Sequence, residues 1–308
     1  MSIEKPRVTL CLPVRNGQES MRRALDSALA QDFRDLEVAV SDNASDDDTA
    51  AILREYVERD LRVRVSTNAE NVGLIENVNM VLRMARGEFV RLLGSDDWIE
   101  PDFVARCVET LERRPEAVGV TTGFRVHLVT GETVYDAKPG EVPDSPDPVR
   151  RLARMLWFYR AGDTVYDPIH GLYRRETLER TGLIRLMTLS DHMLTAELAL
   201  MGPIPHLPAC LAHRSKSYPP SEAALLRRLH PTRWREVDCG PLSSGRVLLG
   251  IVRDSGLTPL QRLRCIPLVA RFTVNRARRY YRRKLRDLKR RRGLTRENVS
   301  KLLGGRTG

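Results

Sequence analysis

The sequence lacks the features that mark a zinc-binding, disulfide-bonded or membrane-spanning chain. Its 308 residues include only five cysteines, and no two of them form a Cys-x-x-Cys pair. Scattered cysteines argue against a zinc site and a disulfide framework, and they are typical of a reducing compartment. The longest apolar runs, such as residues 247–252, fall far short of the roughly 20 residues that a membrane-spanning helix needs.

Residues 1–7 also lack the apolar segment of a secretory signal peptide, so the sequence predicts no leader. We therefore expect a cytoplasmic protein, with the inner face of the plasma membrane as the alternative location. Hydrophobic residues make up 42% of the chain and charged residues 30%. These fractions are ordinary for a protein with a real core, and the length suggests one large or two modest domains.

Positive charge is concentrated in one segment near the end of the chain. The formal net charge is +11. Residues 271–292 alone hold 12 Lys or Arg and one Asp, which accounts for the whole excess. The sequence pI of about 9.8 therefore describes this segment and says nothing about the rest of the protein.

Short apolar runs alternate with amphipathic segments over the first 115 residues. Strand, helix, strand, helix in this rhythm indicates an α/β fold with a mostly parallel sheet flanked by helices. The expected strands are 8–13, 36–41, 62–66 and 88–93, and the expected helices are 18–31, 46–59, 74–85 and 101–114. Ser45 is the expected N-cap of the second helix.

The pattern is less regular after residue 115. We expect strands within 117–135 around a turn at 130–132, a loop at 136–148, and helices at 149–160 and 190–201. A loop from 163 leads into a strand at 169–173, and the chain after 219 is helical and rich in arginine. We place a boundary near 216, with residues 1–215 as the main domain and 216–308 as a helical, basic extension.

Acidic residues follow two of the expected strands. The strand at 36–41 leads into Asp42-Asn43, and the strand at 88–93 leads into Gly94-Ser95-Asp96-Asp97. Open α/β sheets bind ligands at the carboxyl ends of their strands. Neighbouring carboxylates are costly there unless a cation neutralises them, and a hard divalent ion with phosphate as co-ligand would do so. The sequence therefore predicts an enzyme that handles a nucleotide diphosphate.

Four segments in the same order and spacing carry a family resemblance. They are Pro13-Val14-Arg15-Asn16-Gly17, residues 41–49, Asn71-Val72-Gly73-Leu74 with Asn77, and residues 85–98. Together they resemble the family-2 glycosyltransferases of the GT-A fold, clearly over residues 7–115 and more weakly to about 215. The resemblance implies a nucleotide-sugar half at 1–115 and an acceptor half at 116–215.

The resemblance also implies roles for single residues. Asp191 would be the catalytic base, and Asp97, helped by Asp96 and His213, would hold Mg²⁺ or Mn²⁺. His170 and His192 would line the acceptor side. The donor nucleotide would contact Pro13, Arg15, Asn16, Asp42, Asn71, Gly73, Asn77 and Asp96, the last of these leaning toward the ribose. Structural alternatives stay open: an Asx turn for Asp42, helix caps for Asp97 and Asp191, and hydrogen-bonded core positions for the histidines.

The chain departs from the family pattern at two positions. Arg15 stands where the family often has tyrosine, which alters stacking on the base. Gly94 stands where the usual Asp-x-Asp motif has its first carboxylate, which leaves Asp97 as the main expected metal ligand and Asp96 as its helper.

The basic segment places Val274, Ala277, Tyr281, Leu285 and Leu288 on one stripe of a helix, with arginines around them. A basic amphipathic helix of this kind suits an anionic membrane surface, and the acceptor would then be a lipid-linked sugar or an envelope polymer precursor. Packing of the stripe on the main domain is an equal alternative. Nucleic acid is disfavoured because no nucleic-acid-binding motif accompanies the charge.

We therefore expect a metal-dependent, inverting glycosyltransferase that uses a nucleotide-diphosphate sugar, in the first place a UDP-sugar. The acceptor is a sugar, a lipid-linked sugar or a small molecule. One alternative is a sugar-phosphate nucleotidyltransferase, although the glycine-rich basic loop of that class is missing after the first strand. The other alternative is a non-catalytic basic adaptor for membrane or RNA.

Overall fold

The computed structural model describes residues 5–128, 133–135, 141–161, 168–216, 221–240 and 242–291. The expected turn at 130–132, residues 136–140 and 163–167 of the two expected loops, and the end of the chain from 292 lie outside these ranges. Every residue proposed above for a site lies inside them.

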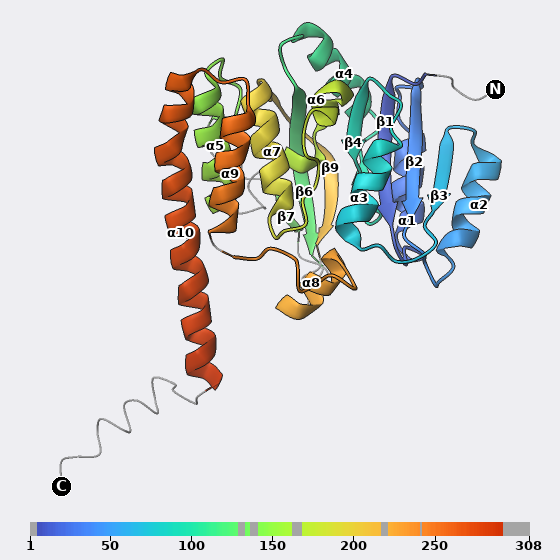
Figure 1. The fold of residues 1–308 in the computed structure, drawn as a ribbon. Helices are drawn as coiled ribbons and strands as arrows, with labels where there is room; N and C mark the ends of the chain where they lie inside the picture. Colours follow the sequence, from blue (N-terminus) through green and yellow to red (C-terminus); the bar gives the residue numbers. More distant parts are fainter. Residues whose placement is uncertain are drawn as a thin grey trace.

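The first half of the sheet is parallel, as the sequence predicts. β1 (Val8–Val14) lies between β2 (Leu36–Asp42) and β4 (Phe89–Leu92), and β3 (Val63–Thr67) pairs with the far side of β2. All residues of β1 and β2 are buried, because helices cover both faces of the sheet. The helices of this half are α1 (Met21–Leu29), α2 (Thr49–Arg59), α3 (Leu74–Arg83) and α4 (Phe103–Arg113), as Figure 1 shows.

The second half of the sheet is mixed. β8 (Leu172–Arg174) runs antiparallel to β4 and to β6 (Gly119–Leu128), and β9 (His206–Lys216) runs parallel to β6. β5 (Trp98–Ile99) pairs with β9, and β7 (Thr133–Tyr135) pairs with β6. The resulting order is β3-β2-β1-β4-β8-β6-β9-β5. A mostly parallel α/β sheet is confirmed, although the sequence did not predict β5 or β9.

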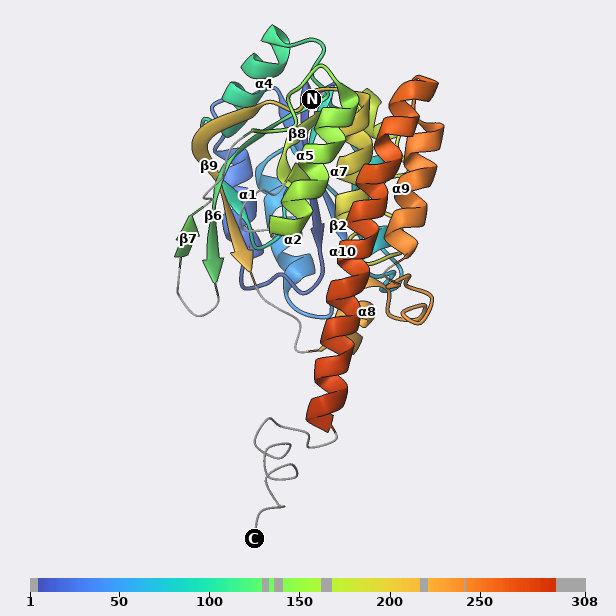
Figure 2. The ribbon, with the colours of Figure 1, turned by 90° about the vertical axis from the view of Figure 1, so that its left-hand side faces the viewer.

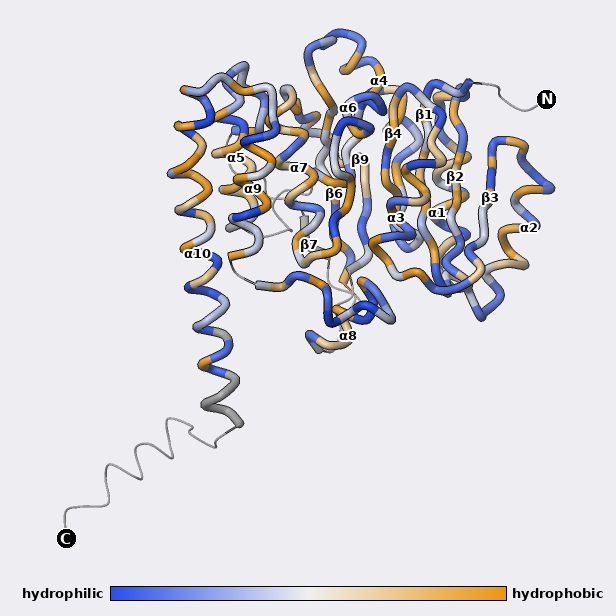
Figure 3. Tube along the Cα trace, viewed as in Figure 1, coloured by the Kyte–Doolittle hydropathy of each residue, from blue (hydrophilic) through white to orange (hydrophobic). Residues whose placement is uncertain are grey.

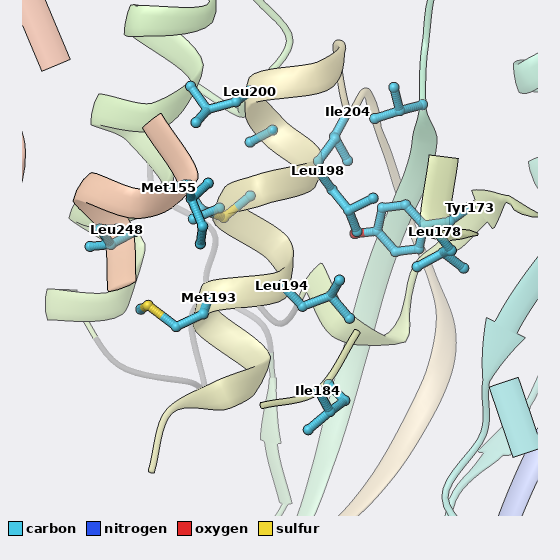
Figure 4. Close-up of a cluster of buried hydrophobic side chains, with 14 of the residues drawn as sticks. Met155, Tyr173, Leu178, Ile184, Met193, Leu194, Leu198, Leu200, Ile204 and Leu248 are labelled. Atoms are coloured by element: carbon cyan, nitrogen blue, oxygen red, sulfur yellow. The ribbon is translucent and has the colours of Figure 1, made fainter. Parts of the chain in front are cut away.

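Three helices that follow the parallel half of the chain share one apolar core. α7 (Ser190–Met201) buries eight of its twelve residues between the sheet, α5 (Pro148–Ala161) and α9 (Ser243–Asp254). Met193 and Leu198 of α7 belong to the same buried cluster as Met155 and Leu248 (Figure 4). Two short elements, the 3-10 turn η1 (Pro168–His170) and α6 (Arg175–Glu179), flank β8. α9 follows the expected boundary near 216 and still packs into this core. The boundary therefore stays a prediction.

α10 (Pro259–Arg291) begins in the body of the protein and runs past it (Figures 1 and 2). Its inner face buries Cys265, Val269 and Phe272. On its outer face, Val274, Tyr281 and Leu285 are exposed, and the helix becomes hydrophilic toward its end (Figure 3). Packing of this stripe on the main domain is therefore wrong for these three residues, and the side chain of Leu288 lies outside the description. None of the helices that the structure describes is long and apolar enough to cross a membrane.

Candidate active site

The elements that carry the predicted carboxylates end or begin at one edge of the molecule. β1, β2 and β4 run in the same direction, so Asp42 at the end of β2 and the loop after β4 lie at the same edge of the sheet. α7 also starts at this edge, at the bottom in Figure 1, and η1 lies against both β4 and α7. Asp42, Asp96 and Asp191 are thus gathered along one edge of the sheet.

Asp42 is almost completely buried at the end of β2, next to Val14 of β1. Its Oδ1 accepts hydrogen bonds from the backbone N–H and the hydroxyl of Ser45. The turn-forming alternative for Asp42 is therefore present in the structure. Oδ2 accepts no hydrogen bond within the described ranges, although the side chain is only 1% exposed. Ser45 is used here and does not cap a helix, since α2 begins at Thr49 with Asp48 as its N-cap residue.

Amide side chains tie the loops around Asp42 together. Asn43 donates to Asn71 Oδ1 (2.9 Å) and accepts from the Val72 N–H (2.9 Å). Asn77, expected to bind the donor, is buried and donates to the Ser41 carbonyl, while its own Oδ1 accepts from Asn68. Asn77 thus holds the ends of the strands in place and has no open face for a ligand.

Arg15 and Asn16 close the turn after β1 onto the segment that follows β2. Arg15 donates to the carbonyls of Asn43 and Ala44, at 3.0 and 2.7 Å. Asn16 donates to Asp46 Oδ1 (2.6 Å) and accepts from the Asp46 N–H. Pro13 is buried within β1, which leaves Arg15 and Asn16 as the exposed members of this expected donor set.

Asp97, the expected main metal ligand, faces the protein interior. Its carboxylate is 2% exposed, Oδ1 accepts from the Ser215 N–H (3.0 Å), and Oδ2 accepts from Arg214 Nε (3.3 Å). The fully buried Arg91 adds a second positive charge nearby, and burial lowers the pKa of Arg91 to about 10. A cation at Asp97 would have to displace Arg214, so the structure corrects this assignment: Asp97 anchors the loop to β9.

Asp96 has the properties expected of Asp97. It is partly exposed, and in the part of the chain that the structure describes its carboxylate accepts a hydrogen bond from its own backbone N–H and from no other residue. Burial raises the pKa of Asp96, and the charge of Asp97 raises it further, whereas Arg214 and Arg228 lower it. A divalent cation relieves this unfavourable charge, so Asp96 is the carboxylate of the pair that fits a metal.

Gly94, which stands where the family motif has its first carboxylate, lies close against both aspartates. A Cβ atom at this position would lie 2.7 Å from Asp97 Oδ2 and 3.1 Å from Asp96 Oδ1. Gly94→Asp is therefore expected to lower the free energy of unfolding by about 1–3 kcal/mol, measured by urea denaturation. Ser95→Asp is the control, because it adds the same charge one residue further on. Equal stability of the two variants would contradict the crowding seen at Gly94.

His213, expected beside the metal, is turned away from it by the alternation of β9. Its Nε2 lies 2.7 Å from Glu100 Oε1, and its Nδ1 lies 3.2 Å from His127 Nε2. The ring also stacks on Trp98, with centroids 4.8 Å apart. Both ring nitrogens have protein partners, so His213 is corrected from a metal ligand to part of a polar and aromatic cluster. No group of three or more His, Cys, Asp or Glu able to hold a metal occurs among the described residues.

His170 lies between the two acidic sites. Its Nδ1 is 3.2 Å from the Leu92 carbonyl and 4.0 Å from Asp97 Oδ2, and burial lowers its pKa. Both Asp97 and Asp191 act on it electrostatically. His170 also lines a small cavity with Thr122 and Arg214. Because the His170 side chain is mostly buried, it fits a structural position in the wall of the acceptor side better than a direct contact with the acceptor.

Asp191 lies in the first turn of α7, and its side chain is 48% exposed. The N-cap residue is Leu189, in a left-handed conformation, and no side chain caps the helix. The capping alternative for Asp191 is therefore excluded, and its carboxylate remains open to solvent. The neighbouring His192 stacks on Tyr159 of α5 at a centroid distance of 4.0 Å, so it faces the helical layer.

Two positively charged residues that no sequence motif marks act electrostatically on Asp96. Arg214 follows His213 on β9 and bonds Asp97, and Arg228 lies on α8 (Glu222–Leu229). Alternation along a strand puts Arg214 on the face opposite His213, but this signal is usable only once β9 is known. α8 lies at this edge because β9, which precedes it, ends there, and β9 was not expected from the sequence.

The model of the family described as Glycosyl transferase family 2 matches residues 9–180, more than half of the chain. A glycosyltransferase from Streptococcus pneumoniae, GlyA, is 34% identical over 185 residues, covering 58% of this chain and 23% of the relative. A chondroitin synthase from Escherichia coli is 36% identical over 108 residues, covering 35% and 16%. The chain thus spans less than a quarter of the length of either relative.

Solved structures share the fold at low identity. TarS residues 1–349 from S. aureus, in complex with UDP-GlcNAc, has a TM-score of 0.64 at 20% identity, over 88% of this chain and 72% of TarS. A mannosyltransferase from Pyrobaculum calidifontis, in complex with GDP-Man and Mn²⁺, has a TM-score of 0.52 at 18% identity, over 88% and 75%. With the family match and the edge of acidic residues, these likenesses lead to one conclusion: the chain belongs to glycosyl transferase family 2.

Proposed function

We propose that this family-2 glycosyltransferase is metal-dependent and inverting, and that it moves a sugar from a nucleotide-diphosphate donor, in the first place a UDP-sugar, to an acceptor hydroxyl. The observation that carries the proposal is that Asp191 is half-exposed, caps no helix, and lies at the same edge as Asp42 and Asp96. The solved complexes of TarS with UDP-GlcNAc and of the mannosyltransferase with GDP-Man support a nucleotide-sugar donor.

The acidic loop fits Mg²⁺ or Mn²⁺. These hard ions take oxygen ligands and are usually held by one or two carboxylates together with substrate phosphates. Asp96 would hold the ion, while Asp97 keeps the loop on β9 through Ser215 and Arg214. A bound ion supplies positive charge that stabilises the departing diphosphate.

The rest of the reaction follows from the protein's own residues. Asp42 would orient the nucleoside through its Oδ2, and the amides around Asn43 would keep that carboxylate in place. Asp191 would take the proton of the acceptor hydroxyl as that oxygen bonds to the anomeric carbon. The bond from the anomeric carbon to the nucleotide oxygen breaks at the same time, and the nucleoside diphosphate leaves. One displacement on the face opposite the leaving group inverts the anomeric configuration.

The function is tested by sugar-nucleotide hydrolysis and transfer over UDP, GDP and dTDP sugars, with Mn²⁺ and with EDTA. We expect release of one nucleoside diphosphate that requires the metal, with UDP-sugars as the best donors. Release of a nucleotide monophosphate or formation of a sugar nucleotide from a sugar phosphate would favour the nucleotidyltransferase. No turnover and no binding over the whole panel would favour the non-catalytic adaptor.

We also infer that an anionic membrane is the partner of the outer face of α10. Apolar side chains are exposed along the whole helix at Leu263, Ile266, Val274, Tyr281 and Leu285. Residues 271–292 carry 12 basic residues and one Asp, so their charge is complementary to anionic lipid headgroups. An acceptor attached to a lipid would then lie close to the catalytic edge, since the basic half of α10 extends on the same side as that edge (Figure 1).

Replacing Arg278, Arg282 and Arg286 together by glutamine is expected to weaken binding to anionic vesicles about a hundredfold, since each basic residue contributes about 1 kcal/mol. Co-sedimentation with phosphatidylcholine vesicles, with and without phosphatidylglycerol, measures this. Arg54→Gln and Arg113→Gln, on α2 and α4, are the controls. Equal binding to neutral and anionic vesicles contradicts the inference, and a preference for RNA over vesicles favours the nucleic-acid reading.

A further inference from the structure

α8 follows β9 in the sequence and lies at the carboxyl edge of the sheet, where β9 also ends. The helix is capped by Ser221, whose hydroxyl accepts from the Ala224 N–H (3.1 Å), and Leu226 is its buried residue. In Figures 1 and 2 it lies below the strands, at the edge where Asp42 and Asp96 are found. α8 is therefore close to the candidate donor site although it follows the family domain in the sequence.

One end of α8 rests on the nucleoside side of this edge. Gly73 precedes α3 with a φ of 87°, and a Cβ atom there would lie 2.5 Å from the Leu229 carbonyl oxygen and 2.7 Å from the His230 Cα. The Gly73 N–H also donates to Asn71, which accepts from Asn43 beside Asp42. Only glycine allows both the backbone conformation and this close approach. The expected donor residue Gly73 thus serves to seat α8.

Two other charged side chains of α8 have partners away from the acidic loop. Arg227 lies over the Trp234 ring, 5.3 Å from its centroid, and Glu222 lies 3.7 Å from Lys284 of α10. The exposed Arg228 acts electrostatically on Asp96, in the direction that favours the ionised carboxylate. Arg228 directly precedes Leu229, so it lies at the end of α8 that rests on Gly73, and no hydrogen bond or ion pair of its side chain is found among the described residues.

We propose that Arg228 binds the diphosphate of the nucleotide donor from the α8 side, opposite the sheet. The proposal rests on the proposed function, because it needs a diphosphate between Asp42 and Asp96. A guanidinium forms two parallel hydrogen bonds with phosphate oxygens, and its charge balances the diphosphate that remains after sugar transfer. The chain after the family domain would then contribute directly to donor recognition.

The test compares binding of UDP and UMP by isothermal titration calorimetry in the presence of Mn²⁺. Arg228→Ala is expected to weaken UDP binding about ten- to a hundredfold and to leave UMP binding nearly unchanged, because the second phosphate is lost in UMP. Arg228→Lys should recover part of the affinity. Arg227→Ala is the matched control on the same helix, and thermal melting of each variant reports on folding.

The outcomes separate the role of Arg228 from the proposed function. Wild-type protein that binds UDP, with Arg228→Ala binding it equally well, overturns the role of Arg228 and leaves the proposed function standing. An equal loss for UDP and UMP overturns it too, since this indicates a structural effect of α8. Wild-type protein that binds neither UDP nor GDP overturns the proposed function, and the role of Arg228 with it.

Discussion

Replacing Asp191 by asparagine is expected to lower kcat by about 10²–10⁴-fold, the usual contribution of a general base. The carboxylate lies half-exposed in the first turn of α7 and caps no helix, so the change removes no structural hydrogen bond. Affinity for the nucleotide should stay within about twofold of the wild type, because Asp191 is assigned to the acceptor. Steady-state kinetics with a saturating UDP-sugar measure kcat, and calorimetry with UDP measures affinity.

Glu197→Gln is the control for this experiment. Glu197 is the other carboxylate of α7 and pairs with Arg185 at 2.7 Å, away from the start of the helix. It should keep kcat close to the wild-type value. A kcat for Asp191→Asn within tenfold of the wild type would remove Asp191 from the role of base, and a product with the donor's anomeric configuration would exclude the single displacement itself.

The parallel half of the fold was predictable because its strands carry an unmistakable signal. β1 and β2 are buried on both faces, so they read as short, mostly apolar runs, and an amphipathic helix separates them. β9 carries no such signal: His206–Lys216 mixes basic, polar and apolar residues and contains a proline. β5 has only two residues and exists through its pairing with β9. These elements depend on tertiary contacts that a local pattern does not contain.

The same dependence on tertiary contacts explains why the contacts of Asp97 and His213 differ from those expected of metal ligands. The sequence predicts that Asp42, Asp96 and Asp191 lie at strand ends or a helix start, and the fold brings them to one edge. The roles of Asp97 and His213 depend on the register of β9, which pairs Trp98 with His213 and places Arg214 against Asp97. Adjacent carboxylates look alike in a sequence, and only their partners separate the anchor from the ligand.

Replacing each of the two neighbouring aspartates by asparagine should therefore affect stability differently. Asp97→Asn leaves Arg214 and the buried Arg91 without their counter-charge and is expected to cost about 3–5 kcal/mol of unfolding free energy. Asp96→Asn removes a carboxylate whose pKa is raised by burial and by Asp97. A raised pKa means that ionised Asp96 costs stability as pH rises through it, so metal-free Asp96→Asn should melt no lower than wild type at pH 7.

The response to Mn²⁺ should be lost in Asp96→Asn and kept in Asp97→Asn. Mn²⁺ with UDP should raise the melting temperature of the wild type and not that of Asp96→Asn, whose Mn²⁺-dependent turnover should fall at least about a hundredfold. Asp97→Asn should keep a response to Mn²⁺ at a temperature where it is folded. Thermal melts with and without Mn²⁺, UDP and EDTA separate these cases. A stable Asp97→Asn that ignores Mn²⁺, beside an Asp96→Asn that still responds, would return the metal to Asp97, and Arg214 would then be a residue that the ion displaces.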